Sequence, residues 1–94
     1  MKINFSSYPM VTLAQPTQLS LSELPAGRSA QVVALELDGD ESAWLAAFGL
    51  FVGQRLTMVR RALAGGPLHV RAASGGEFAL ARSLAVRVAV IADR

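Results

Sequence analysis

The residues of this chain that could do chemistry are one histidine and one short run of acids. His69 is the only imidazole in the 94 residues, and the chain has no cysteine. The lack of thiols excludes thiolate catalysis and the usual structural zinc sites. Any Ser-His-Asp triad would have to use His69, and no segment that could orient its ring is identifiable. The residues therefore indicate a protein that is not an enzyme.

The acidic run ELDGDE, residues 36–41, is the one carboxylate cluster of the sequence and the first candidate for a metal site. Carboxylate oxygens suit hard divalent ions, so the metal-ligand candidates are Glu36, Asp38, Asp40 and the separate His69. The run lacks EF-hand spacing, and it has no imidazole for a borderline ion such as ferrous iron. A solvated loop that caps a helix and a plain surface histidine are the alternatives. We expect no cofactor, with a weakly bound divalent metal ion left open.

Hydrophobic alternation predicts a mainly β fold to carry these residues. Five or six short strands are expected, with unbroken alternation in the principal runs at residues 29–37, 54–61, 68–72 and 86–92. One short α-helix is expected at about 41–48, with Asp40 as its N-cap, and a single helical turn near 82–85. Short strands joined by tight turns point to a small, partly open barrel. Residues 1–18 are expected to form a flexible N-terminal arm, and residues 19–94 the barrel domain.

Two glycines interrupt the apolar stretch FGLFVGQRL, residues 48–56. Gly49 is expected to close the helix in the left-handed conformation, with a capping contact between Leu45 and Leu50. Gly53 is expected to turn the chain into the next strand. Between the two glycines, Leu50, Phe51 and Val52 form a short apolar corner. If the corner is buried it only plugs the barrel, and if it is exposed it is a docking candidate.

Four motifs resemble the FeoA family, the small cytoplasmic protein A of ferrous iron transport. They are LSELPAG, LAAFGLFVGQRLTMV, ALAGGP and LARSLAVRVAV, and together they span about Leu19 to Ala92. The resemblance implies an SH3-like barrel, a cytoplasmic location and a non-enzymatic accessory role in ferrous iron uptake. The chain departs from the family where Gly66 replaces a loop aspartate and where the helix before Gly49 lacks arginine. The binding surface is therefore expected to differ from the common form.

The resemblance also implies a partner, the cytoplasmic GTPase domain of the ferrous iron membrane transporter, which is protein B of the same system. The residues that could contact such a partner are an apolar set and a basic rim. We expect the apolar contact from Trp44, Leu50, Phe51 and Val52, and the basic rim from Arg55, Arg60 and Arg61. Charge is divided along the chain, since residues 1–53 hold two cations against five carboxylates and residues 54–94 hold seven arginines against two.

Other classes of function are left open or excluded by the sequence. A metal- or effector-sensing domain is the main alternative, because the same module occurs in iron-dependent repressors of the diphtheria toxin repressor type. An RNA-binding barrel is a weaker alternative, since the aromatic residues do not alternate with the arginines. No apolar run approaches the roughly 20 residues of a membrane span, so we expect no membrane insertion. Weak self-association is left open.

Overall fold

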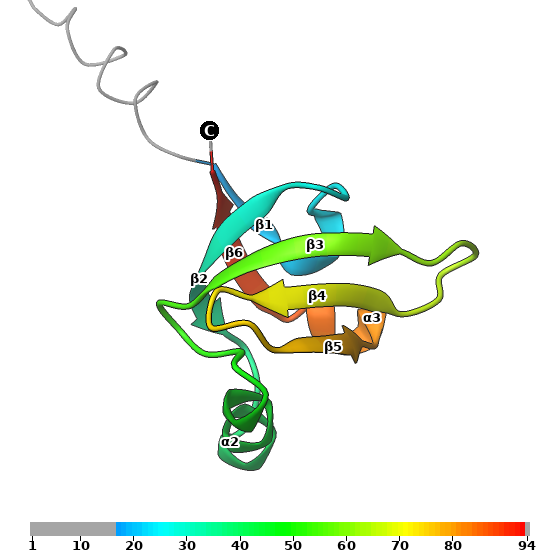
Figure 1. Cartoon of the computed structure of the whole chain (residues 1–94). Coiled ribbons are helices and arrows are strands. Elements are labelled where there is room, and N and C mark those ends of the chain that lie inside the picture. The colour runs from blue at the N-terminus through cyan, green and yellow to red at the C-terminus, as the bar shows by residue number, and fades with distance from the viewer. Residues whose placement is uncertain (1–16, 94) are drawn as a thin grey trace, which may run out of the picture.

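The computed structural model describes residues 17–93, and within them six strands form one antiparallel sheet in the order β1-β6-β2-β3-β4-β5 (Figure 1). The strands are β1 (Gln18–Ser20), β2 (Ser29–Leu35), β3 (Arg55–Arg61), β4 (Leu68–Ala72), β5 (Glu77–Leu80) and β6 (Val88–Ala92). The helices are the 3₁₀ turn η2 (Leu21–Glu23), α2 (Gly39–Ala47) and α3 (Arg82–Ala85). The mainly β fold class is confirmed. The predicted arm lies outside the described residues except for residues 17 and 18, and Gln18 already belongs to β1.

The sheet curls around a core of fifteen buried apolar residues among those described, and none of the buried residues is polar or charged. The alternation predicted for residues 68–72 and for the first half of the run at 54–61 is confirmed, because Leu56, Met58, Leu68 and Val70 are all fully buried while the residues between them are not. The last strand is shorter than predicted: it begins at Val88, and residues 86 and 87 belong to the exit from α3. This single core fills the inside of the curled sheet, whose edge strands β1 and β5 do not pair with each other.

The unbroken alternation expected for the first two long strands is wrong, because each contains a bulge. In β2 the register against β6 shifts between Val32 and Ala34, so Val32 faces the core before the shift and Leu35 packs against the core after it. In β3 the register against β4 shifts between Met58 and Arg60. One extra residue in a strand reverses which side chains face the core, so each bulge moves the residues beyond it to the opposite face.

Helix α2 begins earlier than predicted and has a different N-cap. Asp38, rather than Asp40, has the extended backbone of a cap, with φ −72° and ψ 172°, and its Oδ1 accepts a hydrogen bond from the N–H of Glu41 at 2.7 Å. Asp40 lies inside the first turn, where its charge suits the positive end of the helix dipole. The helix therefore spans Gly39–Ala47 instead of about 41–48.

The two glycines behave as predicted. Gly49 has φ +102° and Gly53 has φ +96°, both in the region that favours glycine. At the end of α2, the N–H of Gly49 donates to the carbonyl of Ala46 at 3.0 Å and that of Leu50 donates to Leu45 at 3.1 Å, which is the Schellman pattern. Leu45 and Leu50 are both buried, in keeping with the predicted capping contact. The N–H of Gln54 then donates to the carbonyl of Phe51 at 3.0 Å and closes the turn that contains Gly53.

Candidate functional site

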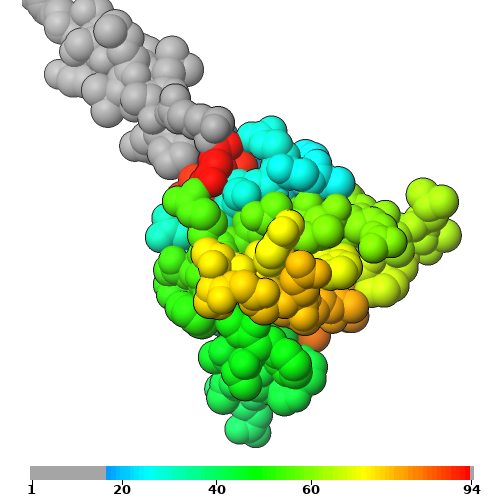
Figure 2. All heavy atoms as spheres, viewed as in Figure 1, coloured from blue at the N-terminus to red at the C-terminus, as the bar shows by residue number. Residues whose placement is uncertain are grey.

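Helix α2 is apolar after its first turn and yet it is largely exposed. Its charges end at Glu41, and residues 43–48 read AWLAAF. Within Gly39–Ala47, all of which is described, Leu45 is the one buried residue. The helix projects from the end of the barrel in both views (Figures 1 and 2). A helix with apolar residues on all sides is normally buried, so this one presents a surface that the fold itself does not cover.

Three aromatic rings form a ridge that runs from α2 to β5. The rings of Trp44 and Phe48, one helical turn apart, meet edge to face with centroids 4.8 Å apart. Phe48 lies 6.1 Å from Phe78 by the same measure. Trp44 is 60% exposed and Phe48 is 46% exposed, whereas Phe78 is partly buried against the core. These contacts hold the exposed rings in place and leave one side of each free for a partner.

A groove lies beside the ridge and is called the helix groove below. It has a volume of about 340 Å³ and is lined by Asp40, Glu41, Trp44 and Leu45 of α2 together with Leu84 of α3. Its floor is apolar, and its rim carries the two carboxylates. The groove would accept an apolar side chain that has cationic neighbours.

The apolar corner is divided between the core and the surface. Leu50 is fully buried, while Phe51 is 43% exposed and Val52 is 57% exposed. Both exposed residues lie in the turn that Gly53 makes possible, between α2 and β3. Leu50 is therefore a plug of the barrel, and the other two extend the apolar surface around the exit from α2.

The three arginines expected to form a basic rim are not gathered in one place. Arg55 begins β3 and forms an ion pair with Asp93. Arg60 and Arg61 end the same strand, about 17–20 Å away at the rise of a β-strand. The Nη1 of Arg61 donates to the carbonyl oxygen of Leu24 at 2.9 Å. Arg55 is at the end of β3 that follows α2, whereas the other two lie at the β3–β4 loop.

The four metal-ligand candidates are not gathered either. Glu36, Asp38 and Asp40 belong to the connection between β2 and α2 and to the first turn of α2. His69 lies in β4, where its Nε2 is 2.9 Å from Oε1 of Glu77. Across residues 17–93 no group of three or more histidine, cysteine, aspartate or glutamate side chains is placed to hold a metal ion.

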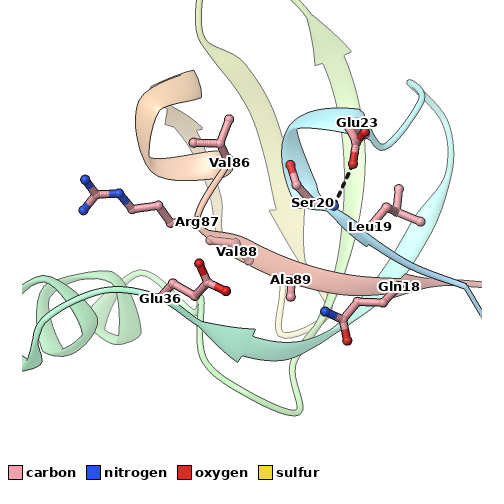
Figure 3. Close-up of a pocket in the computed structure, with 9 residues that line it drawn as sticks. All are labelled: Gln18, Leu19, Ser20, Glu23, Glu36, Val86, Arg87, Val88 and Ala89. Carbon is pink, nitrogen blue, oxygen red and sulfur yellow. Dashed lines mark hydrogen bonds between the residues drawn. The ribbon is translucent and has the colours of Figure 1, made fainter.

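Glu36 lines a separate hollow of about 260 Å³ between β1, the exit from β2 and the start of β6 (Figure 3). Arg87 lines the same hollow, and Glu23 lies at its edge. The Oε1 of Glu23 already accepts a hydrogen bond from the N–H of Ser20 at 3.0 Å, as part of a capping box. The guanidinium of Arg87 points away from the hollow, and its Nη1 lies 3.8 Å from Oε1 of Glu41 (Figure 3). Glu36 is then the main charged group toward the hollow, which is a weak basis for binding a small molecule or an ion.

Sequence reasoning missed Phe48 and Leu84 as parts of the exposed surface. Phe48 follows Trp44 by four residues, the spacing that places two side chains on one helix face, so this signal was present in the sequence. Leu84 belongs to a helical turn that is distant along the chain, and nothing local indicates that it would line a groove with α2.

The family model for the FeoA domain matches residues 19–92. The chain belongs to the FeoA domain family. The resemblance inferred from the four motifs is thus confirmed, and membership supports an accessory role in ferrous iron transport. No curated protein matches the sequence. None of the helices in the described part of the chain has the length and hydrophobicity that crossing a bilayer requires.

Three solved structures place this chain among proteins of known fold. An iron uptake regulatory protein, FeoA, is 26% identical, with a TM-score of 0.72 over 82% of this chain and 99% of that one. FeoA of Stenotrophomonas maltophilia, solved with zinc and described as a prokaryotic SH3 domain protein, is 32% identical, with a TM-score of 0.65 over 81% and 96%. A manganese-dependent transcriptional repressor in complex with manganese is 21% identical, with a TM-score of 0.74 over 85% and 39%, and shares the fold alone. The expected SH3-like architecture is confirmed.

Proposed function

We propose that this chain is a non-enzymatic, cytoplasmic accessory protein of ferrous iron uptake that docks on the GTPase domain of the ferrous iron transporter. The observation that carries the proposal is helix α2, whose apolar residues 43–48 are exposed except for Leu45, although a helix that is apolar on all sides is normally buried. The FeoA family supports the iron-transport context. The exposed aromatic residues support docking as the mode of action, since tryptophan and phenylalanine are enriched where proteins meet.

Trp44 and Phe48 are the expected anchors of the contact. Both are about half exposed, and their edge-to-face packing holds them in one orientation before a partner arrives. Anchors of this kind account for about 2 kcal/mol or more each when they are truncated to small residues. The partner surface is expected to be apolar at its centre with cations facing Asp40 and Glu41 at the rim of the helix groove.

The test is binding of the isolated transporter GTPase domain, measured by titration calorimetry. Trp44→Ser is expected to weaken binding at least about thirtyfold, the equivalent of about 2 kcal/mol. The matched control is Leu63→Ser, which also replaces an exposed apolar residue, in a loop at the far end of β3, and which should bind the GTPase domain at least as tightly as the wild type. Binding of Trp44→Ser at full strength, in a variant that keeps the wild-type circular dichroism, would place the contact elsewhere and refute the proposal.

A metal- or effector-sensing domain is the second candidate function, and the zinc complex of the Stenotrophomonas maltophilia relative favours it. His69 and Glu77 are the imidazole and carboxylate that lie together in this chain. They supply two ligands, fewer than a resident zinc site uses, so docking is our conclusion. Titration with zinc distinguishes the candidates: micromolar binding that His69→Ala abolishes would favour sensing, and unchanged weak binding would exclude this pair as a sensor site.

A further inference from the structure

The loop between β3 and β4, residues 62–67, is a second projection from the barrel (Figures 1 and 2). Leu63 in this loop is 91% exposed, more than any other exposed large hydrophobic residue described. The N–H of Gly66 donates to the carbonyl of Leu63 at 3.1 Å, and the two residues between them, Ala64 and Gly65, have φ values of 57° and 77°. This is a tight turn of the type that carries two positive φ angles, so Leu63 begins its tip.

The side chain of Arg82, at the start of α3, holds the loop in this conformation. The guanidinium of Arg82 donates from Nε to the carbonyl of Gly66 and from Nη2 to that of Ala62, both at 2.8 Å. Left-handed backbone is disfavoured for alanine and persists where surrounding contacts over-determine it, and here Arg82 ties down the residues on both sides of the turn that contains Ala64. Leu63 is therefore held on a rigid loop, so less conformational entropy is lost when it binds a partner.

The loop and the helix groove carry opposite charges. Arg60, Arg61 and Arg82 lie at the base of the loop, and none of them forms an ion pair with a described residue. At the groove, Asp40 also has no described ion-pair partner. Glu41 has one long ion pair, in which its Oε1 lies 3.8 Å from Nη1 of Arg87. The molecule thus has a basic apolar tip at the β3–β4 loop and an acidic apolar groove beside α2.

We propose that the loop of one copy inserts Leu63 into the helix groove of a second copy. The leucine would pack on Trp44 and Leu84, and the arginines at the base of the loop would face Asp40 and Glu41. The contact joins two different surfaces, so each added copy leaves a free tip and a free groove, and association extends with concentration instead of stopping at a symmetric dimer. A single inserted side chain makes a small interface, so the association is weak.

Self-association would fill the helix groove and cover Trp44, which belong to the surface proposed for the transporter, so the free monomer is the form competent to dock. The inference itself does not depend on that docking. Its test uses this chain alone, and a failed transporter titration would leave it standing.

Trp44 is the only tryptophan of the chain and lines the groove, so its fluorescence reports whether the groove is filled. In the wild-type protein, the emission is expected to move to shorter wavelength as protein concentration rises, in parallel with a rise in sedimentation-average mass. Leu63→Ser should raise the concentration of half-association at least about tenfold, because burial of one leucine is worth a factor of that size. Added salt should weaken association as well, since the paired charges are exposed.

Mixing two variants decides between this arrangement and a symmetric one. Leu63→Ser keeps the groove and the tryptophan but lacks the tip, and Trp44→Ser keeps the tip but has no tryptophan and a damaged groove. Each alone should be monomeric at the concentration where the wild type is half-associated, and the mixture should form one-to-one complexes with a blue-shifted emission that comes only from the Leu63→Ser copy. Self-association of either variant at wild-type strength, or a mixture with unshifted emission and unchanged mass, would overturn the proposal. If the serine variant fails to fold, Trp44→Phe serves as a tip donor without tryptophan; because its groove keeps an apolar ring it can self-associate, so only the emission of the Leu63→Ser copy is then read, and an unshifted emission would overturn the proposal.

Discussion

Replacing Gly49 with alanine should destabilise the fold by about 3 kcal/mol, whereas the same change at Gly53 should cost about 1 kcal/mol. Both glycines have strongly positive φ, +102° and +96°, where a side chain costs about 1–2 kcal/mol. The reduced freedom of the unfolded chain returns about 0.4–1 kcal/mol of this cost in each variant. The two sites differ in what a new Cβ would meet. At Gly49 it would lie 3.1 Å from the Cβ of Ala72, and at Gly53 nothing lies within 4 Å.

The contact at Gly49 adds a crowding term to the backbone strain. Ala72 is buried in β4 and cannot move without displacing the core, so we assign this term about 2 kcal/mol from the typical cost of overpacking. In a domain of this size, 1 kcal/mol shifts the melting temperature by about 4–8 °C. Gly49→Ala should therefore melt more than about 10 °C below the wild type, and Gly53→Ala about 5 °C below it.

The assay is urea unfolding followed by far-ultraviolet circular dichroism, because Trp44 is largely exposed and its emission is a poor reporter of folding. Gly39→Ala is the control: its backbone is not in the left-handed region and nothing lies within 4 Å, so alanine should stabilise α2 by a few tenths of a kcal/mol. Ala72→Gly combined with Gly49→Ala should recover the crowding term, with a coupling energy of about 1–2 kcal/mol. Equal losses at Gly49 and Gly53, or no coupling to Ala72, would refute the reasoning.

Two further predictions concern helix α2. Asp38→Ala should cost about 1 kcal/mol in unfolding free energy through loss of the N-cap, while Asp40→Ala should cost at most a few tenths, and the same urea experiment measures both. Leu45→Ala should cost about 2–5 kcal/mol, because this side chain is the one buried anchor of α2 within Gly39–Ala47; hydrogen exchange should show that the amides of α2 lose more protection than those of β3 and β4. Equal losses at the two aspartates, or an even loss of protection, would contradict these expectations.

Local backbone chemistry was the most predictable part of this structure. The positions of Gly49 and Gly53 follow from a helix that must end and a strand that must begin, and both needs are visible within a few residues. The bulges near Val33 and Val59 were not predictable, because valine is equally suited to regular and bulged strands and no turn residue marks either site. The N-cap was undecidable on residue type alone, since Asp38 and Asp40 both satisfy the preference, and the extended backbone and hydrogen bond that identify Asp38 are visible only in the structure.

The candidate site was predictable in kind but not in extent. The sequence marks Trp44 as an apolar side chain on a short helix, but periodicity does not say whether another element covers that side. The split among Arg55, Arg60 and Arg61 has a different cause. An extended strand separates residues by about 3.3 Å each, so Arg55 lies at one end of β3 and Arg60 and Arg61 lie at the other, although the three are close in sequence.

Helix α2 has one buried residue that stabilises the fold and exposed residues available for binding, so the two roles can be tested by separate substitutions. Leu45 belongs to the core, and the barrel is filled by other residues that come from the strands, η2, α3 and the turns. Trp44 and Phe48 lie outside the buried core and are about half exposed. Their exposed apolar surface can be buried only by another molecule. A change at Trp44 that alters association without altering unfolding free energy is therefore the behaviour expected of a docking surface. A change at the same residue that lowers both would mean that the ridge from Trp44 to Phe78 is part of the fold.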